Sequence, residues 1–182
     1  GIPLEIDNNT ERKTATNEEQ SLLNINEAAS KFFTKYLFST KGSKALKYLK
    51  DRGLSLGTIK EFKLGLSPSK NNDLITFLKS EGYNDQDVEN AGLAFKPDNK
   101  PLVDRFRNRV MFPIYNLNDR VVAFGGRSLN TSYGAKYINS AETKVFKKGS
   151  LLFNLKNAQK GLKKNPLVIV EGYMDVISLA NN

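Results

Sequence analysis

The segment that decides the fold class is Val110-Met111-Phe112-Pro113-Ile114-Tyr115, which is followed after a short polar stretch by Val121-Val122-Ala123-Phe124. Both apolar runs are rich in β-branched and aromatic residues, the composition typical of strands. Between them, Asn116-Leu117-Asn118-Asp119 contains the residue types that favour tight turns. We therefore predict a β-hairpin, after which Gly125-Gly126 lets the backbone bend or approach a neighbour closely.

Upstream of this hairpin, the apolar pattern has the period of helices. Hydrophobic residues recur at three- and four-residue steps from Leu22 to Leu37. Thr16 or Asn17 can cap this helix, and Glu19 follows Thr16 with the spacing of a capping box. Shorter helices are predicted at 43–51, 55–62, 72–80 and 85–91, each ending at or near a Gly. The polar residues 1–17 are interpreted as a linker or arm that precedes this helical scaffold.

Downstream of the hairpin, residues 154–164 predict a basic helix. The unbroken apolar run Leu167-Val168-Ile169-Val170 predicts a strand that is buried on both faces of a parallel sheet, and residues 173–180 predict the helix after it. The predicted fold class is α/β (α+β). Small N-terminal helices precede a mixed sheet with a basic surface, and a strand–turn–helix unit ends the chain.

The composition excludes several kinds of active site. Among the 182 residues there is no Cys and no His, which rules out disulfides, Cys/His zinc sites, Cys nucleophiles and His-based triads within this chain. Catalysis would depend on carboxylates, Lys, Arg, Tyr, hydroxyls or an oxygen-ligated metal, and Mg²⁺ or Mn²⁺ suits such ligands. No apolar run approaches the roughly 18 residues of a membrane span, so no segment is expected to cross a membrane.

The positive charge is concentrated in the second part of the chain. Residues 1–100 hold 15 Lys/Arg against 14 Asp/Glu, whereas residues 101–182 hold 13 against 5. This asymmetry favours a polyanionic partner, with nucleic acid first and an anionic membrane second, although a solvated basic face is the simpler alternative.

Two carboxylates stand where α/β proteins place ligands. Glu171 follows the predicted strand, Gly172 permits a tight turn, and Asp175 comes four residues after Glu171 in the first turn of the next helix. Together they could bind a divalent cation or divide metal-binding and acid–base roles. The alternative is an ordinary acidic residue at a helix start, favoured by the helix dipole.

Two further segments carry candidate nucleic-acid contacts. In an extended segment Arg105, Arg107 and Arg109 would share one face, and guanidinium groups bind phosphates through several donors. Gly125-Gly126-Arg127 and the stretch 136–149 mix cations, amides, hydroxyls and aromatic rings, as backbone-tracking and base-stacking surfaces do. Exposed solubilising charge remains the alternative for the cations, and burial in the core remains the alternative for Tyr137 and Phe146.

In this order and spacing, the segments resemble the catalytic core of bacterial-type DNA primases. The resemblance covers residues 25–182 and includes the upstream runs Tyr48-Leu49-Lys50-Asp51-Arg52-Gly53-Leu54 and Phe62-Lys63-Leu64-Gly65-Leu66. The main matching segments are Arg105-Phe106-Arg107-Asn108-Arg109-Val110-Met111-Phe112-Pro113-Ile114, Val122-Ala123-Phe124-Gly125-Gly126-Arg127, Lys136-Tyr137-Ile138-Asn139-Ser140, Phe146-Lys147-Lys148-Gly149 and Val170-Glu171-Gly172-Tyr173-Met174-Asp175.

The resemblance implies synthesis of short RNA primers on single-stranded DNA, with ribonucleoside triphosphates as substrates, a replicative helicase as partner, and a cytoplasmic, nucleoid-associated location. It implies a core subdomain at 18–165 and the start of a metal-binding toprim subdomain at 166–182. Glu171 resembles the toprim glutamate, a metal ligand or acid–base group, and Asp175 a second ligand for Mg²⁺ or Mn²⁺. The residues that resemble the template and nucleotide groove are Arg105, Arg107, Arg109, Arg127, Lys136, Tyr137, Asn139 and Lys148.

The sequence departs from the family pattern at several points. The toprim Asp-x-Asp motif, which the family pattern places after the glutamate, does not occur between Glu171 and Asn182, and the family's amino-terminal zinc module has no counterpart here. Asp119 stands where a turn Gly is common. We therefore expect residues 1–182 alone to be inactive in synthesis. The alternatives are a non-catalytic module that binds single-stranded nucleic acid, and another toprim enzyme such as a topoisomerase or nuclease.

Overall fold

The computed structural model describes residues 16–129, 134–161 and 166–180. Its main sheet is antiparallel and has the strand order β1 (Gly65–Leu66), β4 (Arg109–Tyr115), β5 (Val121–Ser128) and β6 (Tyr137–Asn139). A separate two-stranded ladder pairs β2 (Ala94–Phe95) with β3 (Val103–Asp104). The α/β (α+β) class is confirmed, and where a mixed sheet was predicted, every strand pairing of the described residues is antiparallel.

The predicted hairpin is formed by β4 and β5, with Phe112 opposite Gly125 and Val110 opposite Arg127. Its turn is held by the side chain of Asn116, whose Oδ1 accepts backbone N–H bonds from Asn118 and Arg120, both at 3.0 Å. Asp119 has a φ of 64°, a conformation that Gly adopts most easily and that Asp tolerates better than most residues.

The predicted helices are also present. The long helix α1 (Asn17–Leu37) has the expected capping box: the backbone N–H of Glu19 donates to Thr16 Oγ1 at 3.2 Å, and that of Thr16 donates to Glu19 Oε2 at 2.9 Å. A 3₁₀ turn at Thr40–Gly42 precedes α2. The other helices are α2 (Ser43–Asp51), α3 (Leu56–Glu61), α4 (Asp73–Ser80), α5 (Asp85–Asn90), α6 (Leu155–Gly161) and α7 (Tyr173–Ala180).

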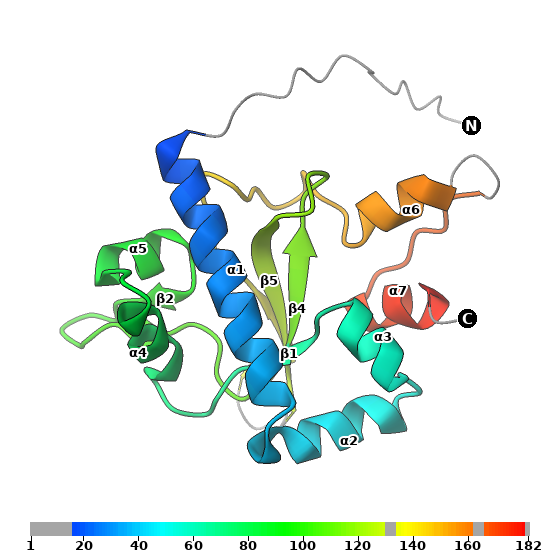
Figure 1. The fold of residues 1–182 in the computed structure, drawn as a ribbon, viewed down its shortest axis with the longest axis horizontal. Helices are drawn as coiled ribbons and strands as arrows, with labels where there is room; N and C mark the ends of the chain where they lie inside the picture. Colours follow the sequence, from blue (N-terminus) through cyan, green and yellow to red (C-terminus); the bar gives the residue numbers. More distant parts are fainter. Residues whose placement is uncertain (1–15, 130–133, 162–165, 181–182) are drawn as a thin grey trace.

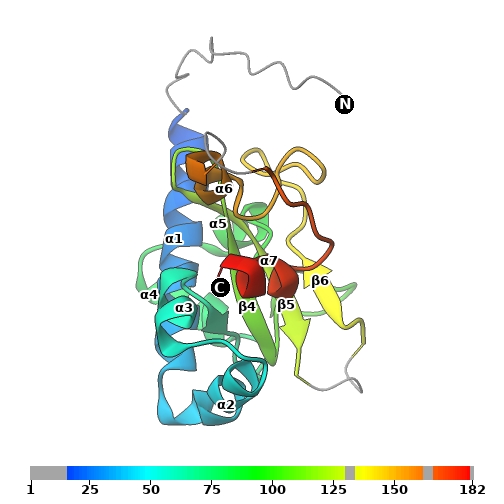
Figure 2. The ribbon, with the colours of Figure 1, turned by 90° about the vertical axis from the view of Figure 1, so that its right-hand side faces the viewer.

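Helices cover both faces of the sheet (Figures 1 and 2). Met111 and Phe124 pack in one buried cluster with residues of α1, α4 and α5, while Val110 and Phe112 pack in a second with residues of α2, α3 and α7. The alternation along β4 follows from the two-residue period of a strand. Because both faces of β4 and β5 are buried, this hairpin is the centre of the fold.

Glycine allows α1 to close onto the sheet at β1. A Cβ at Gly65 would lie 2.5 Å from the Cβ of Phe33, a distance that packed side chains do not tolerate. Phe33 is buried and makes an edge-to-face contact with Phe124. The absence of a side chain at Gly65 therefore brings α1 close enough for its aromatic residues to enter the core.

A buried carboxylate caps α4 from a distant segment. Asp104 Oδ2 accepts the backbone N–H of Leu74 at 2.9 Å, and Oδ1 accepts that of Ile75 at 3.1 Å. Asn72 precedes the helix but makes no side-chain capping bond. Burial raises the pKa of Asp104 to about 6, against the lowering effect of the two backbone bonds.

The strand prediction for Leu167–Val170 was wrong. These residues form no strand in the structure, and the side chains of Val168 and Ile169 are 64% and 72% exposed. A strand buried on both faces needs hydrogen-bonding neighbours, and within the described residues no strand lies beside this segment. The apolar composition of this run is compatible with a strand, but a strand forms only where a neighbouring strand is available to pair with it.

The remaining sequence expectations have mixed outcomes. The predicted linker at 1–17 falls almost wholly outside the described residues, and Asn17 begins α1. The basic helix predicted at 154–164 is confirmed as α6, although residues 162–165 lie outside the described part of the chain. Among the described residues, no helix combines the length and apolar character that crossing a membrane requires.

Candidate nucleic-acid and metal site

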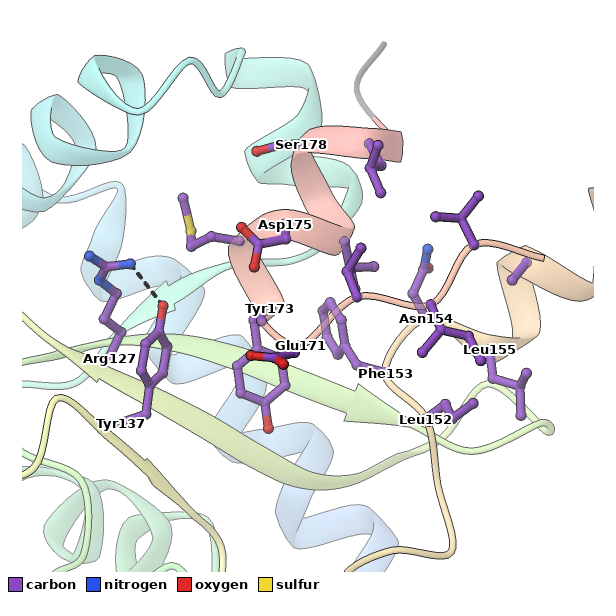
Figure 3. Close-up of a pocket in the computed structure, with 18 of the residues that line it drawn as sticks. Arg127, Tyr137, Leu152, Phe153, Asn154, Leu155, Glu171, Tyr173, Asp175 and Ser178 are labelled. Atoms are coloured by element: carbon purple, nitrogen blue, oxygen red, sulfur yellow. Dashed lines mark hydrogen bonds between the residues drawn. The ribbon is translucent and has the colours of Figure 1, made fainter. Parts of the chain in front are cut away.

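A cleft of about 840 Å³ lies between strands β5 and β6, residues 151–155 and residues 167–179 (Figure 3). It brings together six of the predicted site residues: Arg127, Lys136, Tyr137, Asn139, Glu171 and Asp175. The other four, Arg105, Arg107, Arg109 and Lys148, do not line it. Cations and carboxylates that are far apart in sequence therefore share one cleft.

The Gly125-Gly126 pair allows close packing on both faces of β5. A Cβ at Gly125 would lie 2.5 Å from the ring of Tyr173, and one at Gly126 would lie 2.8 Å from the ring of Phe106. The predicted close approach is therefore confirmed, and the groups that approach are two aromatic rings. On the cleft side, this places Tyr173, the first residue of α7, directly against the sheet.

Tyr173 anchors α7 through stacking and a hydrogen bond. Its ring stacks on Phe112 with centroids 5.1 Å apart and meets Phe153 edge-on at 4.9 Å. Its hydroxyl donates to Asn139 Oδ1 at 2.8 Å. Burial raises the pKa of Tyr173, so the phenol stays protonated and able to donate at neutral pH. The ring thus fixes the helix start that carries both carboxylates.

Glu171 and Asp175 are exposed and lie on either side of this anchor. The backbone N–H of Asp175 donates to the carbonyl of Gly172 at 3.1 Å, and a Cβ at Gly172 would lie 2.6 Å from Asp175 Oδ2. Gly172 therefore leaves room for the carboxylate to fold back over the turn. Two carboxylates suit a hard divalent cation, but no group of three metal-binding acids occurs within the described residues.

The part of the cleft lining contributed by β5 and residues 136–139, here called the basic wall, consists of Arg127, Lys136, Tyr137 and Asn139. Arg127 is buried, and its Nη1 donates to the hydroxyl of Tyr137 at 2.8 Å (dashed in Figure 3). Its guanidinium also lies 5.4 Å from the ring centroid of Tyr137 and 5.3 Å from that of Tyr48. Two rings and a hydrogen bond thus fix the orientation of this cation.

Arg105, Arg107 and Arg109 do not share one exposed face, contrary to the prediction. Asn108 has a φ of 52°, so the segment is not a continuous strand and the alternation of side chains is broken. Arg107 is exposed and its Nη1 donates to Asn71 Oδ1 at 2.8 Å. Arg105 is half-buried and its Nε donates to the carbonyl of Asn139 at 3.0 Å.

Arg109 is buried and holds backbone segments together. Its Nη1 donates to the carbonyls of Ala135 at 2.9 Å, Gly126 at 3.3 Å and Lys136 at 3.4 Å. Burial, reinforced by the nearby charge of Arg107, lowers the pKa of Arg109. These bonds join the strand that carries Arg127 to the segment that presents Lys136, so Arg109 positions the basic wall from behind.

Phe146 and Tyr137, for which burial in the core was the alternative to a nucleic-acid contact, have different positions in the structure. Phe146 is buried in a hydrophobic cluster with Ile114 and Ala123, which confirms its alternative role in the core. Tyr137 is half-buried, packs against the core and also lines the cleft, so it combines both interpretations. Lys148 is exposed, and its backbone N–H donates to Glu142 Oε1 at 2.9 Å.

Sequence reasoning assigned no site role to three residues that help to form the cleft. Tyr173 was counted only as a helix residue, although its position between the carboxylates marks it. Tyr48 and Arg52 were noted only as part of a matching segment, yet both reach the cleft region from α2. Nothing in the spacing of a distant helix indicates which of its side chains meet a strand residue more than seventy positions later.

The comparison with protein families decides the assignment. Residues 32–159 match the family model described as the DNA primase catalytic core, N-terminal domain. The chain belongs to this family. DNA primases from Clostridium acetobutylicum and Deinococcus radiodurans are 42% and 43% identical to it, over 98% and 88% of this chain. These alignments cover only 30% and 28% of the two relatives, so the chain spans about a third of their length.

Solved DNA primase structures share the fold. The DnaG primase catalytic domain bound to single-stranded DNA superposes with a TM-score of 0.80 at 38% identity, covering 90% of this chain and 51% of that one. The RNA polymerase domain of Mycobacterium tuberculosis primase DnaG, in complex with a double-stranded DNA with a 6-nucleotide overhang, gives 0.83 at 33% identity, covering 88% and 51%. Both superpositions thus cover most of this chain and about half of each solved chain.

Proposed function

We propose that the protein containing this chain is a DNA primase that makes short RNA primers by DNA-templated nucleotidyl transfer. The observation that supports this is the shared cleft, which is lined both by the basic wall and by Glu171 and Asp175, in a chain whose residues 32–159 match the primase core family. Nucleotidyl transfer needs cations that hold phosphates and acids that hold metal. The substrates would be ribonucleoside triphosphates, and the partners would include a replicative helicase in a cytoplasmic, nucleoid-associated complex.

In this proposal, Glu171 and Asp175 would hold Mg²⁺ or Mn²⁺, and a cation held there would supply activation of the attacking hydroxyl and neutralisation of the pyrophosphate charge. Arg127 and Lys136 would bind phosphate oxygens. Because Arg127 is already held in one orientation, it would lose little conformational entropy on binding. Tyr173 would keep the carboxylates at a fixed position relative to these cations. Residues 166–180 would accordingly belong to a metal-binding subdomain, and residues 18–165 to the core that precedes it.

The template is proposed to be single-stranded DNA. One structural relative was solved with single-stranded DNA and another with a DNA overhang. The basic half of this chain and the half-buried ring of Tyr137 suit a strand whose phosphates contact cations and whose bases stack. Arg105, Arg107 and Lys148 lie outside the cleft, where they would contact the template at a greater distance from the carboxylates.

A second candidate applies to residues 1–182 in isolation. Because the described residues offer no third acidic group near Glu171, we propose that this chain alone binds single-stranded DNA without synthesis. Measured by fluorescence anisotropy, its affinity would fall steeply as salt rises, since phosphate contacts release counterions. Metal-dependent synthesis by residues 1–182 would refute this candidate and would require other metal ligands.

The test of the main proposal is primer synthesis by the full-length protein on single-stranded DNA with Mg²⁺ or Mn²⁺. Wild-type protein should incorporate ribonucleotides, and Glu171→Gln should abolish incorporation while single-stranded DNA binding persists. Glu89→Gln is the matched control, because Glu89 is an exposed acid on α5 that does not line the cleft. Full synthesis by Glu171→Gln would refute the metal role, and a wild-type protein without synthesis would refute the proposed function.

A further inference from the structure

Helices α1 and α4, which lie side by side in Figure 1, border a second hollow, here called the α1–α4 groove. It has a volume of about 490 Å³, and within the described residues it shares no lining residue with the cleft. Its aromatic lining consists of Phe32 and Tyr36 from α1 and Phe77 from α4. The other lining residues are Lys31, Lys35, Ser39, Thr40 and Lys41. A hollow of this size can accept side chains of a bound molecule.

The three rings form a stacked apolar surface. The ring centroids of Phe32 and Phe77 lie 4.8 Å apart with an interplanar angle of 24°, and those of Phe32 and Tyr36 lie 6.4 Å apart at 21°. All three side chains are only half-buried, although aromatic rings gain free energy when they leave water. The groove therefore offers apolar area that a partner can still remove from solvent.

Three lysines border this apolar surface. Lys31 and Lys35 are exposed on α1, and the ammonium of Lys41 lies 5.9 Å from the ring centroid of Tyr36. None of the ion pairs found in the described part of the chain involves these lysines. Residues 1–100 are nearly balanced in charge, with 15 Lys/Arg against 14 Asp/Glu. The groove is thus a local positive site outside the basic second part of the chain.

The spacing of the lysines favours an acidic peptide over a small anion. Lys31 and Lys35 are about one helical turn apart and Lys41 lies beyond the end of α1, so the cations spread over roughly 10 Å or more. One carboxylate or phosphate cannot contact all three, whereas a peptide with several acidic residues can. Amphipathic peptides bind grooves of this kind by inserting apolar side chains.

A nucleic acid suits this groove less well. Bases stack on free ring faces, but Phe32 already stacks on Phe77 and on Tyr36. Among the described residues, the cations that line the groove are all lysines, whereas arginine supplies the planar donors that match a phosphate. An apolar surface with a lysine border is complementary to apolar side chains that are flanked by carboxylates.

We propose that the α1–α4 groove is a docking site for an acidic peptide segment of a partner protein. The segment inserts an aromatic or large aliphatic side chain against Phe32 and Phe77. Its carboxylates lie beside Lys31, Lys35 and Lys41. The apolar side chain contributes buried area, while the carboxylates contribute orientation and a faster encounter. This site is separate from the proposed primer synthesis and does not depend on it.

The experiment measures the binding of short fluorescein-labelled peptides to the full-length protein by fluorescence anisotropy. In the first peptide two Phe stand among Asp and Glu, in the second both Phe are replaced by Ser, and in the third every acid is replaced by Lys. The protein variant combines Lys31→Glu with Lys35→Glu. Its matched control combines Lys50→Glu with Lys60→Glu, because these lysines are exposed and line neither the groove nor the cleft. Thermal unfolding checks the fold of each variant.

Wild-type protein should bind the first peptide at least about 5-fold more tightly than either of the others, since both the apolar anchor and the charge contribute. The Lys31→Glu, Lys35→Glu variant should weaken this binding about 10-fold or more, because reversed charges repel the acids, and the control should keep wild-type affinity. Binding should also weaken as salt rises. Saturating single-stranded DNA should leave the peptide bound, and primer synthesis by the variant should equal that of wild-type protein.

The proposal is overturned if wild-type protein binds the first peptide no more tightly than the Ser-substituted one, or if the folded Lys31→Glu, Lys35→Glu variant matches the control. Displacement by single-stranded DNA would show that the peptide binds in the cleft, which also overturns it. A variant that loses affinity for single-stranded DNA instead would make the groove a nucleic-acid surface. A variant that loses self-association in analytical ultracentrifugation would make the occupant a second copy of the protein.

Discussion

The two sides of the cleft are built differently. The basic wall is supported by the fold: Arg127 is held between two tyrosine rings, and Arg109 binds the backbone of the segment that presents Lys136. On the acidic side, residues 166–175, both carboxylates are exposed, and the segment is held at its end by the ring of Tyr173 and the buried side chain of Met174. Burial therefore preorganises Arg127, whereas Glu171 and Asp175 remain open to solvent. Substitutions on the two sides should have separable effects.

The largest expected effect concerns the acidic side. Asp175→Asn in the full-length protein should reduce kcat for primer synthesis about a thousandfold or more, because a metal contributes several kcal/mol to the transition state. The free energy of unfolding should change by less than about 0.5 kcal/mol, since Asp175 is exposed. Kinetics and urea unfolding measure the two quantities. If the Asp175→Asn variant loses activity only to the extent that it unfolds, the role of the acidic side is structural.

Arg109 provides the next largest effect, on stability. Arg109→Ala should lower the free energy of unfolding by about 2–4 kcal/mol, because three backbone carbonyls lose a buried charged donor and the packing of the side chain is lost. Arg107→Ala is the control and should change the free energy by less than about 1 kcal/mol. Urea unfolding of both variants tests this, and equal losses would contradict the distinction between them.

Asp104 gives a pH-dependent prediction. Its pKa is raised from 3.8 to about 6 in the folded state, so the folded protein binds this proton more tightly than the unfolded chain. Its contribution to stability is therefore greatest below about pH 4 and falls as pH rises to about 6. Relative to Asp104→Asn, wild-type protein should lose roughly 1–3 kcal/mol across this range. Urea unfolding at several pH values measures this loss. A wild-type protein that gains stability relative to Asp104→Asn as pH rises would contradict the prediction.

The smallest effect is expected from the anchor of α7. Tyr173→Phe removes the hydroxyl that donates to Asn139 but keeps the stacked ring, so stability should fall by about 0.5–1.5 kcal/mol. Because the carboxylates would lose some of their fixed position, kcat should fall further than DNA affinity. The matched control is Tyr83→Phe, which lies near α5 and away from the cleft. An unchanged ratio of kcat to DNA affinity would argue against an anchoring role.

Much of the fold could be predicted from the sequence, because helix caps, helix periodicity and turns depend on residues that are close in the chain. The period of α1, its capping box and the turn at Asn116–Asp119 depend on residues a few positions apart, and all three are confirmed. The strand predicted at Leu167–Val170 failed because pairing depends on a neighbour rather than on composition. Local chemistry determines which structures a segment can form, and tertiary contacts determine which of them does form.

The site was predictable in its chemistry and less so in its geometry. The motif order identified six residues that do share the cleft. It could not separate Arg109 from Arg107, because a positive φ at Asn108 interrupts the strand alternation between them. It also gave no site role to Arg52, since the contact between Tyr48 and Arg127 exists only after α2 has packed beside the sheet. Residue type predicts possible ligands, while burial determines which side chains remain available.

The packing of Tyr173 against Gly125 has a mechanical consequence. Glu171 comes two residues before this ring and Asp175 two residues after it, so both acids lie within about one helical turn of a fixed point on the sheet. The contact between this ring and Gly125 thus helps to fix where the first turn of α7 lies relative to β5, the strand that carries Arg127. A single methyl group at Gly125 would displace the ring of Tyr173 and, with it, the first turn of α7 that carries Asp175.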